Sequence, residues 1–511
     1  MAALLWPGGP TCVALLAMSL LACQSEEPVR RPAVDAGGGF DLGGMGDVRV
    51  DDVREPSADS DSADSAPDSD ETITDTDDDA DSTAPDIEMP DTAPPDTALP
   101  DTGAADGEGD GNDGAILDAA DANDADGDTT ADPWPTVPGP VDGTLSLVVV
   151  ALPTGAPSLT VPHVAGSFNG WTHEAMQPSV FGSWRLDIPL VATGSVAYKF
   201  TAGNWESEEI EFRGPGNDRR LDWNGDARVV AHVVRGFAGQ PRAAGSTSGE
   251  IRVVTDFEIP QFGRTTTLRV YLPPDYGATE RRYPVLYMHD AQNLFDTASS
   301  GFGVEWQVDE ALQRLFFEGA VGGLIVVGVD NGPERACDFS PWPNATGCEG
   351  RAGRGDAYAT FFVDTLKPWV DETFRTLASR ESTWIAGSSR GGMAAFYIGM
   401  KHQEVFSRIG AFSPTMLETV LQESMSDFVA EQGRRRPMRI HLDYGTAEQV
   451  LGYDAPTLIA GLDLVYDALV DAGFSEDDEV RRVIVPGAIH NEADWAARFP
   501  GTLEWLAEAL R

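Results

Sequence analysis

Short apolar runs alternate with longer segments of helical periodicity from Ile251 to the end of the chain. Short apolar runs predict strands, and apolar residues recurring every three or four positions predict helices. Leu324–Val329 is apolar almost throughout, which indicates burial on both faces and hence a mainly parallel sheet. We therefore predict an α/β fold for residues 250–511. The predicted strands are Ile251–Phe257, Thr266–Leu272, Val285–His289, Leu324–Val329, Thr383–Ala386, Ile409–Phe412, Met438–Asp443 and Val480–Val485; the predicted helices are Val308–Phe317, Tyr358–Phe374, Gly391–Met400, Pro456–Asp471 and Glu492–Leu510.

Short strands separated by turn residues characterise residues 141–236. This spacing is typical of a small β-sandwich. The segment Arg235–Gly249, rich in Gly, Ala, Pro and Ser, is predicted to separate this β-sandwich from the α/β domain. The predicted strands are Leu145–Ala151, Val161–Ser167, Trp184–Pro189, Ser195–Thr201 and Arg228–Val234.

Neither pattern occurs in residues 24–140, which consist mainly of Asp, Ala, Pro, Ser, Thr and Gly. Between Gln24 and Trp134 there are 28 Asp and 6 Glu against 4 Arg, a net charge of −30 out of −48 for the 511 residues. Such a segment cannot bury a core, so we predict a disordered, self-repelling acidic linker. This acidity also excludes nucleic acid as an expected partner.

The first 23 residues are predicted to be a targeting signal. The apolar run Val13–Leu21 is too short to span a membrane. It ends in Leu20-Leu21-Ala22-Cys23, which resembles a bacterial lipobox with Cys23 as the lipidated residue, although no Lys or Arg precedes the run. The resemblance implies a lipid-anchored protein of the bacterial cell envelope, on the periplasmic or surface face of the outer membrane.

Two further cysteines, Cys337 and Cys348, lie close together in a loop rich in Pro, Gly and Asn. In an exported protein this spacing predicts a disulfide that closes a surface loop. No His lies nearby to complete a metal site, so none is expected there.

Candidate chemistry begins at Ser389, in the sequence Gly387-Ser388-Ser389-Arg390-Gly391. A predicted strand precedes this G-x-S-x-G pattern and a predicted helix of small residues follows it, which is the context of a nucleophile elbow. We expect Gly387 and Gly391 to be glycines because a Cβ there would collide with the neighbouring strand and helix. Ser389 is therefore the candidate nucleophile.

A nucleophilic serine needs a base and an orienting acid, which follow it in the order acid then histidine in this kind of fold. Among the histidines after Ser389, His402 comes too soon and His441 lies within a predicted strand, which leaves His490 as the base. The acid is expected after the strand Met438–Asp443, where the candidates are Asp443, Glu448 and Asp454. The oxyanion hole is expected to use the amide of Arg390 and one amide of the loop Tyr287–Asp296.

Together these motifs resemble the esterase family of α/β-hydrolases that includes feruloyl esterases, S-formylglutathione hydrolases, siderophore-ester hydrolases and mycolyltransferases. The resemblance implies that Ser389 is the nucleophile, Glu448 the acid and His490 the base. It also implies that the amides of Ala291 and Arg390 form the oxyanion hole, although the family usually has Gly at the position of Ala291. No metal or organic cofactor is implied. The matching segments are His289–Asp296, Ile325–Asn331 with Arg335, Gly387–Gly392, Tyr444–Glu448 and His490–Trp495.

The predicted β-sandwich has a resemblance of its own. Val164–Trp171, Tyr198–Thr201, Asn204–Glu206 and Asn217–Arg219 are similar to segments of starch-binding and glycogen-binding modules. Indole faces suit the apolar faces of sugar rings. Trp171, Trp205 and Trp223 are the candidate carbohydrate-binding residues, and packing roles for Trp171 and Trp205 are the alternative.

The predicted function is that of a serine carboxylesterase acting through an acyl-enzyme, on carbohydrate-linked or siderophore-type esters. The alternatives are acyl transfer to a sugar acceptor and a non-catalytic carbohydrate-binding surface lipoprotein. The expected partners are a small-molecule or glycan-linked ester and, through the lipid anchor alone, a membrane. Nothing in the sequence indicates an oligomeric state.

Overall fold

The computed structural model describes residues 137–151, 160–211, 214–215, 218–240 and 245–508. The predicted signal with Cys23, and nearly all of the predicted linker, lie outside these residues, so the boundaries at residues 23 and 140 stay predictions. None of the helices in the described part of the chain combines the length and the apolar character that a membrane span requires.

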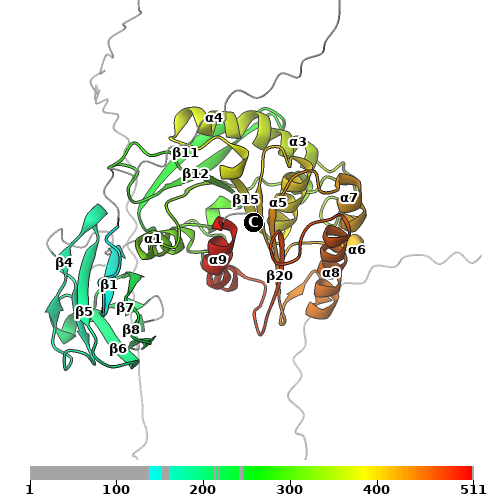
Figure 1. Cartoon of the computed structure of the whole chain (residues 1–511). Coiled ribbons are helices and arrows are strands. Elements are labelled where there is room, and N and C mark those ends of the chain that lie inside the picture. Colours follow the sequence, from blue (N-terminus) through cyan, green and yellow to red (C-terminus); the bar gives the residue numbers. More distant parts are fainter. Residues whose placement is uncertain (1–136, 152–159, 212–213, 216–217, 241–244, 509–511) are drawn as a thin grey trace, which may run out of the picture. The chain divides into compact units, whose positions relative to one another are not determined.

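An eight-stranded sheet organises the C-terminal half of the chain (Figure 1). Its strand order is β11-β12-β14-β13-β15-β16-β17-β20. The pairs β11–β12 and β12–β14 are antiparallel and all the other neighbours are parallel, which confirms the prediction of a mainly parallel sheet. The strands are β11 (Glu250–Ile259), β12 (Arg264–Leu272), β13 (Val285–His289), β14 (Ile325–Val329), β15 (Thr383–Ser388), β16 (Arg408–Phe412), β17 (Arg439–Gly445) and β20 (Val480–Val485).

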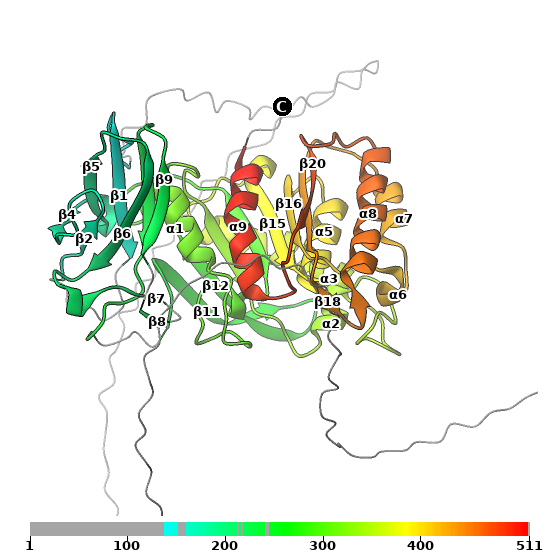
Figure 2. The same cartoon turned by 90° about the horizontal axis from the view of Figure 1, so that it is seen from below.

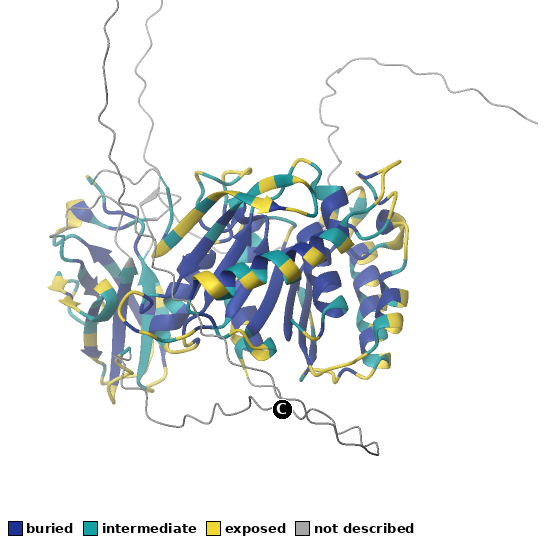
Figure 3. Ribbon diagram, turned by 90° about the horizontal axis from the view of Figure 1, so that it is seen from above, coloured by how far each residue is buried: buried dark blue, intermediate teal, exposed yellow. Residues whose placement is uncertain are grey.

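Helices cover both faces of this sheet (Figure 2). On β13, Leu286 and Met288 face a core formed with α1 and α9, while Val285 and Tyr287 face a larger core formed with the other helices. This alternation explains why β13 to β17 are buried along their whole length, as Figure 3 shows. The helices are α1 (Val308–Glu318), α2 (Arg335–Phe339), α3 (Gly355–Thr360), α4 (Lys367–Thr373), α5 (Arg390–Lys401), α6 (Glu418–Leu421), α7 (Met425–Gln432), α8 (Ala455–Asp471) and α9 (Glu492–Ala507).

The helix predicted over Tyr358–Phe374 consists of α3, a π-helical segment Phe361–Leu366 and α4. Pro368 lies in the first turn of α4, where its missing N–H breaks the regular hydrogen-bond pattern. The π-helical segment accommodates that break, so the helix continues instead of ending.

The described residues between 144 and 233 form two four-stranded sheets, which we call the β-module. The strand orders are β10-β1-β5-β4 and β3-β2-β6-β9, and side chains from both sheets form one core that includes Leu147 and Phe200. Its strands are β1 (Thr144–Ala151), β2 (His163–Gly166), β3 (Glu174–Ala175), β4 (Gln177–Pro178), β5 (Trp184–Pro189), β6 (Gly194–Thr201), β9 (Arg219–Trp223) and β10 (Arg228–Val233). The described residues also contain two short hairpins. These are β7–β8 (Ile210–Glu211, Gly214–Pro215) and, in the C-terminal half, β18–β19 (Gln449–Val450, Tyr453–Asp454).

The prediction that Trp223 of the β-module binds carbohydrate is wrong. Its side chain is only 2% exposed and belongs to the core between the two sheets. Trp223 ends β9 on the inward side of that strand, so its ring cannot stack on a sugar. Trp205 is 44% exposed and its ring lies 6.3 Å from that of half-buried Trp171.

Candidate active site

Ser389 lies at a sharp turn between β15 and α5. Its φ of 54° and ψ of −122° are strained for a residue with a side chain. A Cβ on Gly387 would lie 2.6 Å from the backbone of Gly391, and one on Gly391 would lie 3.0 Å from a carboxylate oxygen of Asp290. The expected need for glycine is therefore confirmed at Gly387, a Cβ on Gly391 would be in tight contact with that carboxylate, and Ser389 lies at the tip of a turn with the geometry of a nucleophile elbow.

His490 lies after β20, in the loop before α9, and its Nδ1 is 2.8 Å from Glu448 Oε2. The Glu448 side chain is fully buried. Its other oxygen accepts hydrogen bonds from the Ser413 hydroxyl at 2.6 Å and from the Gly445 amide at 2.7 Å. The indole of Trp495 packs edge-on against the imidazole, with ring centroids 4.9 Å apart. Both partners of the His490–Glu448 pair are thus fixed in orientation.

The two other candidate acids lie in different environments. Asp443 is buried, and its carboxylate lies 3.1 Å from His441 Nε2 and 3.2 Å from Arg498. Asp454 is exposed and caps the start of α8, where it accepts a hydrogen bond from the Thr457 amide. Of the three candidates, Glu448 is the carboxylate in contact with His490.

Ser389 and His490 line the same cavity, whose volume is about 660 Å³. Aromatic side chains form part of its wall, including Trp306 and Phe302, and Phe302 is 73% exposed. The remaining wall is largely polar and includes Asn331, Arg335 and Glu492. Burial raises the pKa of Glu492, and the nearby Asp290 carboxylate adds to that effect.

The loop after β13 forms the opposite side of the cavity. Asp290 has a φ of 59°, and its carboxylate accepts two hydrogen bonds from Arg335, at 2.6 and 2.7 Å, and one from Asn331 at 2.6 Å. Burial alone would raise the pKa of Asp290, but the Arg335 guanidinium outweighs it and the net pKa is lowered. Asp290 therefore stays ionised and holds the loop in place.

Ala291 and Arg390 both begin helical turns. Ala291 starts a short 3₁₀-helix (Ala291–Asn293) and Arg390 starts α5, so each backbone N–H precedes any intrahelical acceptor. Ala291 is fully buried, and a Cβ on Gly328 of β14 would lie 2.6 Å from the Ala291 Cβ. The absence of a side chain at Gly328 thus leaves space for Ala291, at a position where the esterase family that this chain resembles usually has glycine.

The predicted disulfide between Cys337 and Cys348 is present. The loop that it closes contacts the elbow, because the Thr346 carbonyl accepts a hydrogen bond of 2.5 Å from the Arg390 side chain. Burial lowers the pKa of Arg390. A loop distant in sequence therefore positions the residue that directly follows Ser389.

Three non-glycine residues with positive φ, Asp290, Ser389 and Ser413, follow three neighbouring strands. Asp290 follows β13, Ser389 follows β15 and Ser413 follows β16. Each φ lies between 42° and 59°. Unfavourable backbone conformation therefore occurs after each of these three strands, at the carboxyl edge of the sheet, and two of the three residues, Asp290 and Ser389, line the cavity.

Three further residues, Ser413, Trp495 and Arg498, belong to the site although the sequence patterns did not predict them. Ser413 receives hydrogen bonds of 3.0 Å from the Trp495 indole and from Arg498, and donates one to Glu448. Ser413 directly follows a buried strand, and a polar residue in that position could have been taken as a candidate. Arg498 lies on the buried side of α9, where the periodicity alone gave no signal.

The C-terminal half of the chain, which contains this site, matches a known protein family. Residues 259–506 match the family described as "Putative esterase". They belong to that family. We call residues 250–511 the esterase domain; it is accordingly a carboxylic ester hydrolase, and its fold is that of the α/β-hydrolases.

Curated relatives match part of the chain at low identity. "Uncharacterized protein YbbA" of Bacillus subtilis is 25% identical over 242 residues, which cover 46% of this chain and 90% of that protein. An "Endo-1,4-beta-xylanase/feruloyl esterase" of Xylanibacter ruminicola is 29% identical over 174 residues, which cover 32% of this chain and 22% of that protein.

Among solved structures, a ferulic acid esterase matches with a TM-score of 0.39 and 20% identity, covering 50% of this chain and 98% of that chain. The enterobactin esterase FES from Shigella flexneri matches with a TM-score of 0.40 and 15% identity, covering 69% and 89%.

Proposed function

We propose that the esterase domain is a serine carboxylesterase in which Ser389 is the nucleophile, His490 the base and Glu448 the orienting acid. The observation that supports this assignment best is the 2.8 Å contact between Glu448 and His490 Nδ1, beside a cavity that His490 and the elbow serine both line. With Nδ1 turned to the carboxylate, His490 presents Nε2 to accept the serine proton.

In the proposed reaction, Ser389 Oγ attacks the ester carbonyl and its proton passes to His490 Nε2. The amides of Ala291 and Arg390 donate to the oxyanion of the tetrahedral intermediate. Collapse of that intermediate breaks the bond to the alcohol, which leaves with the proton from His490. Water then attacks the acyl-enzyme by the same steps, and the carboxylic acid is released.

We infer that the substrates are small-molecule or glycan-linked esters that carry an aromatic acyl or alcohol part. The aromatic side chains Phe302 and Trp306 in the cavity wall support this inference, because aromatic rings stack favourably on one another. The Xylanibacter ruminicola relative is named a feruloyl esterase, and a feruloyl ester has an aromatic acyl part. The preference for aromatic esters can be tested by measuring hydrolysis rates on pairs of esters that differ only in having an aromatic or an aliphatic part. Equal rates on the two members of each pair would contradict the inference.

Substitution of the elbow serine tests the proposed chemistry. Ser389→Ala should reduce p-nitrophenyl ester hydrolysis by at least about 10⁴-fold, because no other group replaces the nucleophile. Ser388→Ala should retain most activity, since Ser388 ends the strand before the turn. Mass spectrometry after reaction with a fluorophosphonate should locate the adduct on Ser389. An adduct on Ser388 would show that the register is wrong.

We also propose that the β-module binds carbohydrate through Trp205, supported by Trp171 and His173. The Trp205 ring is exposed, and His173 packs against its edge at 4.5 Å, which holds the indole in one orientation. Trp205→Ala should abolish retardation of the protein in gels that contain soluble starch. If wild type and variant migrate identically in these gels and in gels with other glucans, the β-module has no such role.

A further inference from the structure

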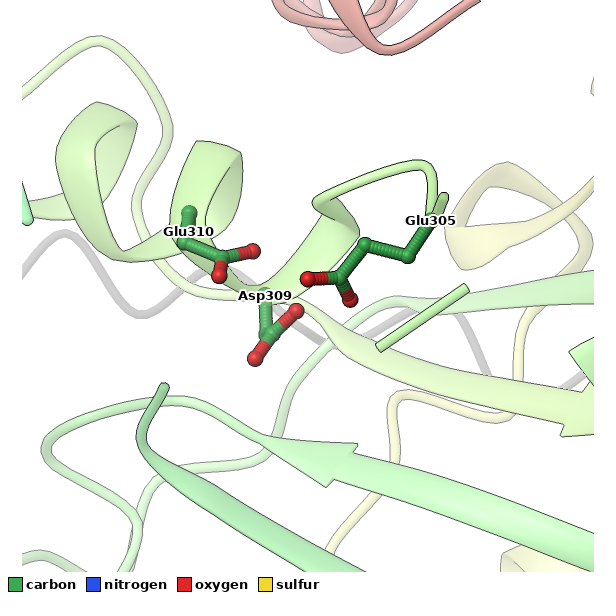
Figure 4. Close-up of side chains that lie close together, drawn as sticks. All are labelled: Glu305, Asp309 and Glu310. Carbon is green, nitrogen blue, oxygen red and sulfur yellow. The ribbon is translucent and has the colours of Figure 1, made fainter. Parts of the chain in front are cut away.

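Three acidic side chains lie buried together outside the ester cavity (Figure 4). Glu305 precedes α1, and Asp309 and Glu310 lie in the first turn of that helix. Their exposed fractions are 1%, 0% and 4%, and one oxygen atom of each lies within 4.8 Å of the others. We call these three residues the acidic cluster.

Each carboxylate of the acidic cluster has one oxygen held by a protein donor and one that is not. The second oxygens, Glu305 Oε2, Asp309 Oδ1 and Glu310 Oε2, are buried and have no hydrogen-bond donor among the described residues. Buried carboxylate oxygens normally have such donors. The donors to the first oxygens are the Ser246 hydroxyl to Glu305, the Ser248 amide to Asp309 at 2.5 Å and Arg235 to Glu310 at 2.9 Å.

Two neutral oxygens beside the acidic cluster also lack partners in the described part of the chain. The Ser248 hydroxyl is buried and without a partner, and the amide of that residue already contacts Asp309. The Tyr271 hydroxyl of β12 is likewise buried and without a partner. Burial raises the pKa of Tyr271, and Asp309 is the charged group that raises it most. Two buried hydroxyl groups without hydrogen-bond partners, those of Ser248 and Tyr271, are therefore found next to the acidic cluster.

The charges of the acidic cluster do not balance. Arg235 is the cation in direct contact with the acidic cluster, at 2.9 Å from Glu310 and 3.5 Å from Glu305. Arg314 also acts on Glu310, and Asp296 adds further negative charge near Glu305. Acidic residues in a first helical turn are usually explained by the helix dipole, but they are then solvated. Here they are buried, which is costly without a counter-ion.

We propose that the acidic cluster binds one divalent cation of the calcium type. The three free carboxylate oxygens supply its ligands, with the Ser248 hydroxyl beside them. Calcium accepts six to eight oxygen ligands at about 2.3–2.6 Å, so oxygens up to about 5 Å apart fit around it. Two positive charges would neutralise the two negative charges that remain when Arg235 and Arg314 are set against Glu305, Asp309, Glu310 and Asp296 in their ionised forms. Magnesium fits less well because it gives up its water ligands reluctantly.

Such a cation would connect the wall of the ester cavity to the segment that follows the β-module. Val304 and Trp306, on either side of Glu305, line the cavity. The residues that hold the carboxylates from the other side, Arg235 and Ser246, belong to the segment between the β-module and β11. Removing the ion is therefore expected to loosen both that segment and the loop that carries Trp306.

The first test measures the thermal midpoint of the full chain in calcium chloride and in EDTA. At a free calcium concentration of 100 times the dissociation constant, the midpoint should rise by about 5 °C. Terbium, a luminescent substitute for calcium, should show emission sensitised by Trp306, and calcium should abolish it. Neither readout depends on ester hydrolysis, so failure here is distinct from failure of the proposed triad.

Matched variants separate the acidic cluster from the acidic linker, which also attracts cations. Asp309→Asn should lose both the calcium shift and the terbium signal, whereas Glu372→Gln, an exposed acid of α4, should keep both. Glu305→Gln serves as a second variant if Asp309→Asn does not fold. Equal midpoints in calcium and EDTA for wild type would overturn the proposal, as would an unchanged shift in Asp309→Asn. In those cases the carboxylates would share protons instead of an ion.

Discussion

The proposed triad acid has both oxygens engaged, one by His490 and the other by Ser413 and Gly445. Glu448→Gln would turn an amide towards His490 and favour the wrong imidazole tautomer. In a well-studied triad the corresponding change lowers kcat about 10⁴-fold, so a loss of at least about 10² is expected here, with little change in KM. Steady-state kinetics on p-nitrophenyl esters measures both constants.

The matched control for that variant is Asp454→Asn. Asp454 is an exposed helix cap, and Asn caps equally well, so kcat should stay within about tenfold of wild type. Asp443→Asn is expected to reduce stability, because it removes the buried partner of Arg498. If Asp454→Asn lost more activity than Glu448→Gln, the acid would be misassigned.

A second residue-scale prediction concerns His289. Burial lowers its pKa to about 4, with Asp290 opposing that effect and Arg335 adding to it. Between about pH 4 and 6.5 the unfolded chain binds a proton here and the folded chain does not, so stability falls as the pH falls. His289→Asn should make the drop in unfolding free energy between pH 7 and pH 4.5 about 2 kcal/mol smaller. Denaturant titrations at both pH values would contradict this if the two proteins lost equal amounts.

At the scale of elements, the elbow depends on a glycine. Gly387→Ala would place a Cβ 2.6 Å from the backbone of Gly391, so the turn must shift and both kcat and the thermal midpoint should fall. The control is Gly501→Ala in α9, where the added methyl has no atom within 4 Å. The free energy of unfolding of Gly501→Ala should rise by about 0.5–1 kcal/mol, because alanine is more stable than glycine inside a helix. Thermal unfolding and steady-state kinetics measure the midpoint and kcat of both variants. If Gly387→Ala matched Gly501→Ala in both quantities, the steric argument would be contradicted.

The disulfide is a second element-scale feature with a measurable effect. Closing a loop with a sequence separation of 11 stabilises the folded state by about 3 kcal/mol in the chain-entropy account. The double variant Cys337→Ala, Cys348→Ala should lose about that amount in denaturant titrations. Its kcat should also fall, since the loop holds Arg390 through Thr346. A stability unaffected by the double change would show that the loop is held by other contacts.

Strong periodicity made the sheet of the esterase domain predictable. Each of its predicted strands lies within two residues of an observed boundary at each end, and the boundaries match best where the strand is buried and apolar, as in β13 and β14. The elements that were not predicted are short or polar: β9 (Arg219–Trp223) mixes charged and apolar residues, and α6 spans only four residues. Their formation depends on tertiary contacts that no local pattern records.

The site was predictable to the extent that motifs and chain order specify it. Ser389 followed from the G-x-S-x-G motif between a strand and a helix, His490 and the shortlist of acids followed from chain order, and the resemblance selected Glu448. The burial of Trp223 was missed because composition does not say which side of a strand faces the core. Ser413 was missed because its role appears only where β16 and β17 bring residues from distant segments together.

At the scale of the whole molecule, we propose that a lipid on Cys23 tethers the folded part to the bacterial envelope. If the predicted linker of roughly 115 residues behaves as a flexible coil, it would span about 60 Å, and repulsion between its negative charges would lengthen it. Cys23→Ser should move the protein from the membrane fraction to the soluble fraction. Cys12→Ser, a cysteine earlier in the same signal, should leave the distribution unchanged. Membrane association that survives Cys23→Ser would rule out the lipid anchor.

The positive φ values of Asp290, Ser389 and Ser413 have a consequence for laboratory evolution. Each such residue costs about 1–3 kcal/mol relative to a relaxed backbone; Asp290 and Ser389 line the ester cavity, and Ser413 lies behind it against Glu448. Selection for heat resistance alone would favour glycine at these positions and relax the turns that hold the catalytic groups. Selection for turnover would keep them strained. Libraries screened only for thermal tolerance are therefore expected to accumulate inactive clones with changes at this edge of the sheet.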